Sequence, residues 1–177
     1  MIVLIRRIYV ELPSTGRGIV VQIKFPFDSS SPISGEASIK INKSIADVFA
    51  FIGDRFYENY PKWAPEVVEL EPLDGEQLFV GAKTKQVRAD QGALVESVFE
   101  ITDYRPVVNL TFKGIDEPYK HEYVLKSTDE SDCTELTFRF ELSEVEVFMR
   151  PFQKLIRASI EEGAENTVEN IKNLMLA

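Results

Sequence analysis

The chain has 177 residues and a formal charge of −9, with 20 Lys and Arg against 29 Asp and Glu. Hydrophobic residues make up 44% of it, which indicates a folded domain of ordinary size and excludes a largely disordered chain. The negative charge opposes binding to nucleic acid and to anionic membranes. There is no run of about 18 apolar residues and no pattern of an export signal. We therefore expect no membrane span and a cytoplasmic location.

Residues 1–33 are expected to form an N-terminal extension before a main domain at 34–177. Two strand-like runs, Ile2–Leu12 and Gly18–Phe27, flank a stretch rich in turn-forming residues, which predicts a β-hairpin. The free edges of such a hairpin would allow two chains to pair as a homodimer.

The main domain is predicted to open with a strand and two short helices. Ala37, Ile39 and Ile41 alternate with polar residues, as in a strand with one buried face. Ser44 followed by Asp47 resembles a helix-capping pair. A second short helix or turn is expected over Arg55–Tyr60, ending before Pro61 because a proline disfavours helical geometry at the preceding residue.

Six strands in an antiparallel meander are predicted to follow, and then one long helix. Turn-forming clusters punctuate the stretch after Pro65, and Thr134–Leu142 alternates most clearly between apolar and polar residues. From Pro151 to Met175 apolar residues recur every three or four positions, which indicates an amphipathic helix that must cover the sheet. Within it, we interpret Gly163–Ala164 as a point of close packing on the sheet, rather than as space left over a cavity.

Three segments of the chain resemble a known family. They are Tyr60–Leu70 with a Pro-Trp corner, Val80–Thr84 with a glycine opening a strand, and Phe99–Pro106 with a turn containing proline. Together they resemble the polyketide cyclase/dehydrase and lipid-transport family of the START/Bet v 1-like (SRPBCC) superfamily. The resemblance implies an α+β helix-grip fold, in which a curved antiparallel sheet wraps around the C-terminal helix, with a cavity for apolar molecules between them. It brings no catalytic set of residues.

Strand alternation gives the side chains that would line such a cavity. Aromatic and aliphatic residues would supply most of the lining, with a few polar anchors, as in pockets for small apolar ligands. The expected ligand-binding residues are Trp63, Gln86, Arg88, Phe99, Phe112, His121, Tyr123, Phe138, Phe140, Phe152 and Ile156. The alternative is that the aromatic side chains simply fill the core.

His121 and Tyr123 are the weak candidates for acid–base chemistry. His121 would otherwise hydrogen-bond a neighbour such as Tyr123, or contact a ligand, because a buried polar group without a partner is costly. Arg88 would turn out to solvent if its strand carried a β-bulge. With one histidine, Cys133 as the single cysteine, and no phosphate-binding loop, we expect no metal site and no cofactor.

Three functions remain open at this point. The first is binding or carriage of a small hydrophobic ligand, lipid-like or polyketide-like. The second is an enzyme, a cyclase or dehydratase acting on an apolar carbonyl compound. The third is a protein-interaction module that uses the N-terminal hairpin. The scarcity of catalytic side chains favours the first.

Overall fold

The computed structural model describes residues 32–90, 92–129, 132–143, 145 and 147–177. The hairpin expected in the N-terminal extension, and any dimer formed through it, lie outside the described residues. The first described element, β1, begins at Ile33.

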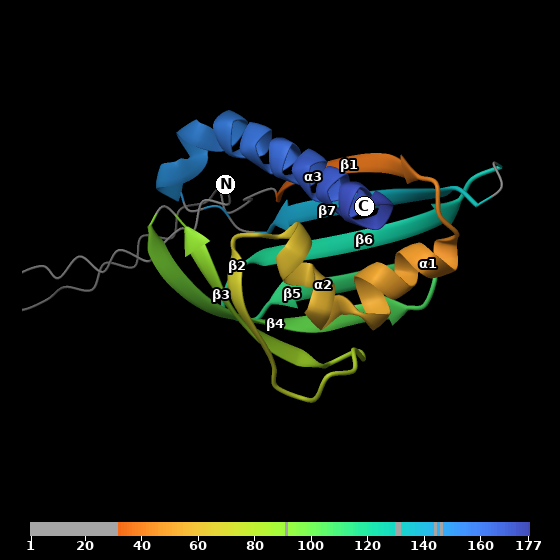
Figure 1. The fold of residues 1–177 in the computed structure, drawn as a ribbon. Coiled ribbons are helices and arrows are strands. Elements are labelled where there is room, and N and C mark those ends of the chain that lie inside the picture. The colour runs from red at the N-terminus through yellow and green to blue at the C-terminus, as the bar shows by residue number, and fades with distance from the viewer. Residues whose placement is uncertain (1–31, 91, 130–131, 144, 146) are drawn as a thin grey trace, which may run out of the picture.

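The described residues form a single seven-stranded antiparallel sheet with the order β1-β7-β6-β5-β4-β3-β2 (Figure 1). The strands from β2 to β7 follow one another as a meander, as predicted, and β1 adds to the far edge beside β7. The strands are β1 Ile33–Ile41, β2 Val67–Pro72, β3 Lys83–Asp90, β4 Ala93–Arg105, β5 Asn109–Gly114, β6 Tyr119–Ser127 and β7 Thr134–Leu142.

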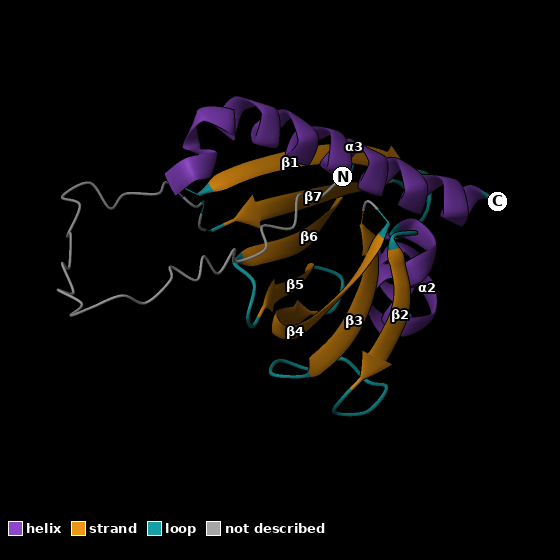
Figure 2. Ribbon diagram, turned by 90° about the vertical axis from the view of Figure 1, so that its left-hand side faces the viewer, coloured by secondary structure: helices purple, strands orange, loops and turns teal. Residues whose placement is uncertain are grey.

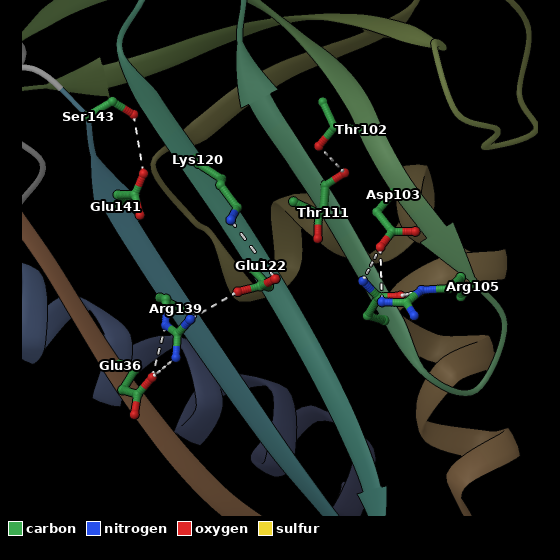
Figure 3. Close-up of polar contacts among 11 residues, drawn as sticks. Glu36, Thr102, Asp103, Arg105, Thr111, Lys120, Glu122, Arg139, Glu141 and Ser143 are labelled. Carbon is green, nitrogen blue, oxygen red and sulfur yellow. Dashed lines mark hydrogen bonds and ion pairs between the residues drawn. The ribbon is translucent and has the colours of Figure 1, made fainter. Parts of the chain in front are cut away.

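The two faces of the sheet differ in polarity because side chains alternate along each strand. In β7, Leu136, Phe138 and Phe140 are buried on the concave face. Arg139 lies on the convex face, where its guanidinium group donates to Glu36 at 2.5 and 2.9 Å and to Glu122 at 3.4 Å (Figure 3). The convex face is thus a polar surface, as alternation predicts for Arg139.

Three short helical segments connect β1 to β2: α1 (Ile45–Phe49), η1 (Ala50–Asp54) and α2 (Phe56–Trp63). The predicted cap is confirmed, since Ser44 Oγ accepts from the Asp47 N–H at 3.2 Å and donates to Asp47 Oδ2 at 2.7 Å. The predicted end of the second helix is wrong, because Pro61 lies inside α2. A proline in a helix interior costs about 3 kcal/mol. Burial of Tyr60 and Trp63, at about 1.5–3 kcal/mol for each large side chain, offsets that cost.

The C-terminal helix α3 (Gln153–Leu176) lies along β1 and β7 on the concave side of the sheet (Figure 2). It follows a 3₁₀ segment, η2 (Val147–Phe152), so the regular helix begins two residues after Pro151. The side chains that it buries follow at steps of three and four: Ile156, Ile160, Ala164, Val168 and Ile171. This arrangement confirms the predicted α+β helix-grip fold.

At Gly35 on β1, α3 comes very close to the sheet. A Cβ atom placed there would lie 2.9 Å from the backbone nitrogen of Glu161 and 2.9 Å from Cγ2 of Ile160. By contrast, a Cβ atom on Gly163 would meet nothing within 4 Å. The close-packing interpretation of Gly163–Ala164 is therefore wrong for Gly163, although Ala164 beside it is fully buried, and Gly35 is a glycine against which the helix packs closely.

We predict that Gly35→Ala destabilises the protein by about 1–3 kcal/mol, because the added methyl group pushes against the backbone of α3. Gly163→Ala is the matched control on the helix itself, and should stabilise by up to about 1 kcal/mol through helix propensity. Urea denaturation of both variants measures the two effects. Equal stability of Gly35→Ala and wild type would contradict the close approach.

Candidate functional site

Aromatic side chains from α2 fill the centre of the hollow formed by the sheet. Phe56 and Tyr60 stack with ring centroids 4.7 Å apart. Phe56 also meets Phe112 edge-on at 5.7 Å, and Phe99 lies 4.5 Å from Phe112. These rings contact each other directly, so Phe99 and Phe112 act here as core residues, and the open space lies elsewhere.

A pocket of about 290 Å³ remains between the middle of α3 and the end of β3. Its wall combines the corner between α2 and β2, the last residues of β3, and one face of α3. The lining residues are Trp63, Pro65, Glu66, Arg88, Ala89, Asp90, Gly163, Asn166, Thr167 and Asn170. The lining is more polar than the apolar cavity expected from the sequence.

Gly163 leaves space in the wall of this pocket. It is half-buried and has no atom near its missing Cβ, and its carbonyl accepts from Thr167 Oγ1 at 2.8 Å. A glycine inside a helix is unfavourable by about 1 kcal/mol relative to alanine. Packing does not require a glycine at this position. What the missing side chain does is leave open volume in the pocket.

Trp63 ties together the elements around the pocket. Its indole Nε1 donates to the Tyr123 hydroxyl on β6 at 3.2 Å, and its carbonyl accepts from Asn170 Nδ2 on α3 at 3.1 Å. The side chain is buried, with 1% exposure. Trp63 therefore fixes α2 against both the sheet and the C-terminal helix.

Arg88 is a buried cation at the pocket wall. Its side chain is only 8% exposed, and Nη2 donates to Glu66 Oε1 at 2.5 Å. Burial opposes the charge, but Tyr60 and Glu66 outweigh this effect and raise the pKa of Arg88 above its usual value. The bulge considered for β3 lies instead in β2, between Val67 and Glu69, so Arg88 keeps its inward direction.

A second polar group, formed by Gln86, Ser97 and Tyr119, lies on the same face of the sheet as Arg88. Gln86 Nε2 donates to the Tyr119 hydroxyl at 2.9 Å and to Ser97 Oγ at 3.2 Å. The Tyr119 ring reaches Gln86 from β6 by passing over Gly114, where a Cβ atom would lie 2.7 Å from the ring. Gly114 therefore makes this long cross-sheet contact possible.

His121 lies among aromatic rings, with centroids 4.7 Å from Phe112 and 5.1 Å from Phe140. Burial, with a smaller contribution from the charge of Arg88, holds the pKa of His121 well below 6.5, so its imidazole is neutral near pH 7. The expected hydrogen bond between His121 and Tyr123 is absent among the described residues, where the Tyr123 hydroxyl accepts from Trp63 Nε1. His121 Nδ1 has no hydrogen-bond partner among the described residues.

The ligand-binding residues expected from the sequence fall into three groups. Trp63 and Arg88 line the pocket. Gln86, His121, Tyr123, Ile156 and the phenylalanines at 99, 112, 138 and 140 are buried on the concave side. The prediction for Phe152 is wrong, since this residue lies in η2 with 52% exposure and does not line the pocket.

The prediction missed the polar face of α3. Asn166, Thr167 and Asn170 line the pocket together with Gly163. They follow Gly163 by three, four and seven residues, which places them on one helix face, and that spacing was visible in the sequence. The spacing did not indicate a pocket, because polar residues on a helix usually face solvent.

The arrangement of a curved sheet gripping a C-terminal helix is that of Bet v 1-like proteins. Ara h 8.0201 has 13% sequence identity to this chain and a TM-score of 0.63, over 82% of this chain and 99% of its own. A major latex-like protein of Panax ginseng has 15% identity and a TM-score of 0.60, over 82% and 99%. The di-domain ARO/CYC of the steffimycin biosynthetic pathway has 12% identity and a TM-score of 0.64, over 81% of this chain and 50% of that chain.

Residues 32–175 match the model of the family described as polyketide cyclase / dehydrase and lipid transport. The chain belongs to this family, as its three sequence segments indicated. No curated protein matches the sequence. In the described part of the chain, no helix is both long and apolar enough to cross a membrane.

We predict that His121 makes the stability depend on pH. Its pKa is lowered by folding, so the unfolded chain binds more protons below about pH 6.5, and the free energy of unfolding falls as the pH drops toward the folded pKa. The slope from one such group is at most about 1.4 kcal/mol per pH unit. Urea denaturation between about pH 5 and 8 measures this change in the free energy of unfolding with pH.

His121→Phe is the control for this effect. The chain has no other histidine, so the difference in stability between wild type and variant isolates the contribution of this side chain. Relative to the variant, the wild type should lose stability on acidification. Parallel pH curves for the two proteins would contradict a neutral, buried His121.

Proposed function

We propose that the protein binds a small, mainly apolar molecule in the pocket between α3 and β3. The observation that carries this proposal is the open space beside Gly163, where the helix carries an unfavourable glycine without any steric need for it. The volume of about 290 Å³ lies just below the range typical of small-molecule pockets, about 300–1,000 Å³, so the ligand would be small. The family description, which includes lipid transport, agrees with this function.

The chemistry of the wall favours a ligand with an apolar body and a polar end. Trp63, Pro65, Ala89 and the open face at Gly163 offer apolar contact. On the other side, Arg88 supplies hydrogen-bond donors that Glu66 holds in place. The apolar body would contribute affinity at about 25 cal/mol per Å² buried, and the polar end would set the orientation.

Binding, rather than proton-transfer catalysis, agrees with the positions of the two weak catalytic candidates. Neither His121 nor Tyr123 belongs to the lining of the described pocket. Burial raises the pKa of Tyr123 well above 10, and its hydroxyl accepts from Trp63, so it is poorly placed to exchange a proton near pH 7. A cyclase or dehydratase would need such a group beside the substrate.

The test uses Gly163→Leu, whose side chain projects into the pocket. It should weaken binding about tenfold or more, because it occupies the volume that the ligand needs. Trp63 is the single tryptophan of the chain and lines the pocket, so its fluorescence reports binding of menthol and menthane, two compact probes of suitable size. Native mass spectrometry of the protein from its source would look for a copurifying molecule.

Ala158→Leu is the matched control, because it adds the same side chain to an exposed position of the same helix. It should bind the probes like the wild type. Equal affinity of Gly163→Leu and Ala158→Leu would overturn the proposed pocket, as would the failure of the wild-type protein to bind either probe.

A further inference from the structure

The two sides of the pocket offer opposite kinds of hydrogen-bonding group. On the β3 side, the guanidinium group of Arg88 has five N–H donors and no acceptor, and its bond to Glu66 uses one of the donors. On the α3 side, Thr167 and Asn170 line the pocket with a hydroxyl and an amide group. A polar group bound between the helix and the strand has to match both sides.

The α3 side presents acceptors, because its donors are engaged within the protein. The Thr167 hydroxyl has a single proton, which it donates to the Gly163 carbonyl at 2.8 Å. Asn170 Nδ2 donates to the Trp63 carbonyl at 3.1 Å. A carbonyl only accepts, so this bond fixes the orientation of the Asn170 amide and leaves Oδ1 as its acceptor. The helix side of the pocket therefore requires a donor on the ligand.

The charges of the lining select against ionised ligands of either sign. Two carboxylates, Glu66 and Asp90, face one guanidinium group, so the lining has a formal charge of −1. A carboxylate ligand would compete with Glu66 for Arg88 and would be repelled by Asp90, two residues further along β3. An ammonium ligand could accept nothing from Arg88 and would carry the same charge. The buried arginine thus does not make this pocket a site for fatty acids.

We infer that the polar end of the ligand is an uncharged amide, such as a carboxamide or a lactam. Its carbonyl accepts from Arg88, and its N–H donates to Thr167 and Asn170. An amide carries the acceptor and the donor on separate atoms of one planar group, which suits partners on two facing sides of a pocket. This inference rests on the proposed function and names the class of ligand that the same pocket takes.

The experiment compares three probes of nearly the same shape: cyclohexanecarboxamide, cyclohexyl methyl ketone and cyclohexanecarboxylate. The ketone keeps the acceptor and lacks the N–H donors, and the carboxylate adds a negative charge at about pH 7.5. Binding to the full-length protein is followed by the fluorescence of Trp63. The wild type should bind the amide about 3- to 10-fold more tightly than the ketone, the range for one net hydrogen bond. It should bind the carboxylate about tenfold more weakly than the amide, or worse.

Thr167→Val tests the donor contact, because it replaces the accepting hydroxyl with a methyl group of similar size. The preference for the amide over the ketone should fall about threefold or more. Thr137→Val is the matched control, since Thr137 lies on the convex face, where its hydroxyl bonds Ser38 at 2.7 Å. The control should keep the full preference. An unchanged preference in Thr167→Val would overturn the inference.

Asp90→Asn tests the role of charge at a residue that is not fully buried. It removes one negative charge from the lining and should narrow the difference in affinity between amide and carboxylate about threefold or more. An unchanged difference would contradict the electrostatic part of the inference. If either Thr167→Val or Asp90→Asn unfolded, the other variant and the wild-type comparison would decide, since the two residues lie on different elements.

The outcomes separate this inference from the proposed function. Equal binding of amide and ketone by the wild type, or tighter binding of the carboxylate, would overturn the inference. The pocket would still stand if Gly163→Leu weakened the binding of these probes. If the wild type bound none of the three probes and neither menthol nor menthane, the proposed function would fall and the inference with it.

Discussion

The packing of α3 against β1 is the constraint on which the rest of the structure depends. At Gly35 the strand has no side chain, so the backbone of the helix near Glu161 comes within contact distance of the sheet. The buried side chains of α3, from Ile156 to Ile171, lie along the same face of the helix. This contact fixes the distance between the helix and the sheet at the β1 edge. Near β3 and β2, at the opposite edge of the curved sheet, another element separates the helix from the sheet.

What separates them is α2, and its side chains divide the interior into a filled part and an open part. Phe56 and Tyr60 occupy the centre of the hollow against Phe99 and Phe112, and Trp63 bridges from β6 to α3. The space beyond Trp63 is left to Arg88 and to the polar face of α3. The pocket is therefore the part of the hollow that the side chains of α2 leave unfilled. It is small because those side chains fill most of the hollow.

The sequence predicts the strands and the helix-grip fold because alternation and helical spacing are local properties, as Phe138 and Arg139 on β7 illustrate. It also predicts which residues of β3 and β6 point inward, because that follows from the same alternation. It does not predict whether Phe99 lines a cavity or contacts another ring, since this depends on Phe56, more than forty positions away. It also did not predict that Gly35, and not Gly163, faces the close contact, because what faces a glycine is a property of the fold.

The buried polar side chains lower the stability of this fold. An apolar core would be more stable than one containing Arg88, Gln86 and His121, because each unsatisfied buried polar atom costs about 1–3 kcal/mol. Glu66 compensates the charge of Arg88, and Tyr119 satisfies one half of the Gln86 amide, but Gln86 Oε1 and His121 Nδ1 have no hydrogen-bond partner among the described residues. A ligand bound in the pocket offsets part of this cost, since it stabilises the folded state in proportion to the logarithm of its concentration.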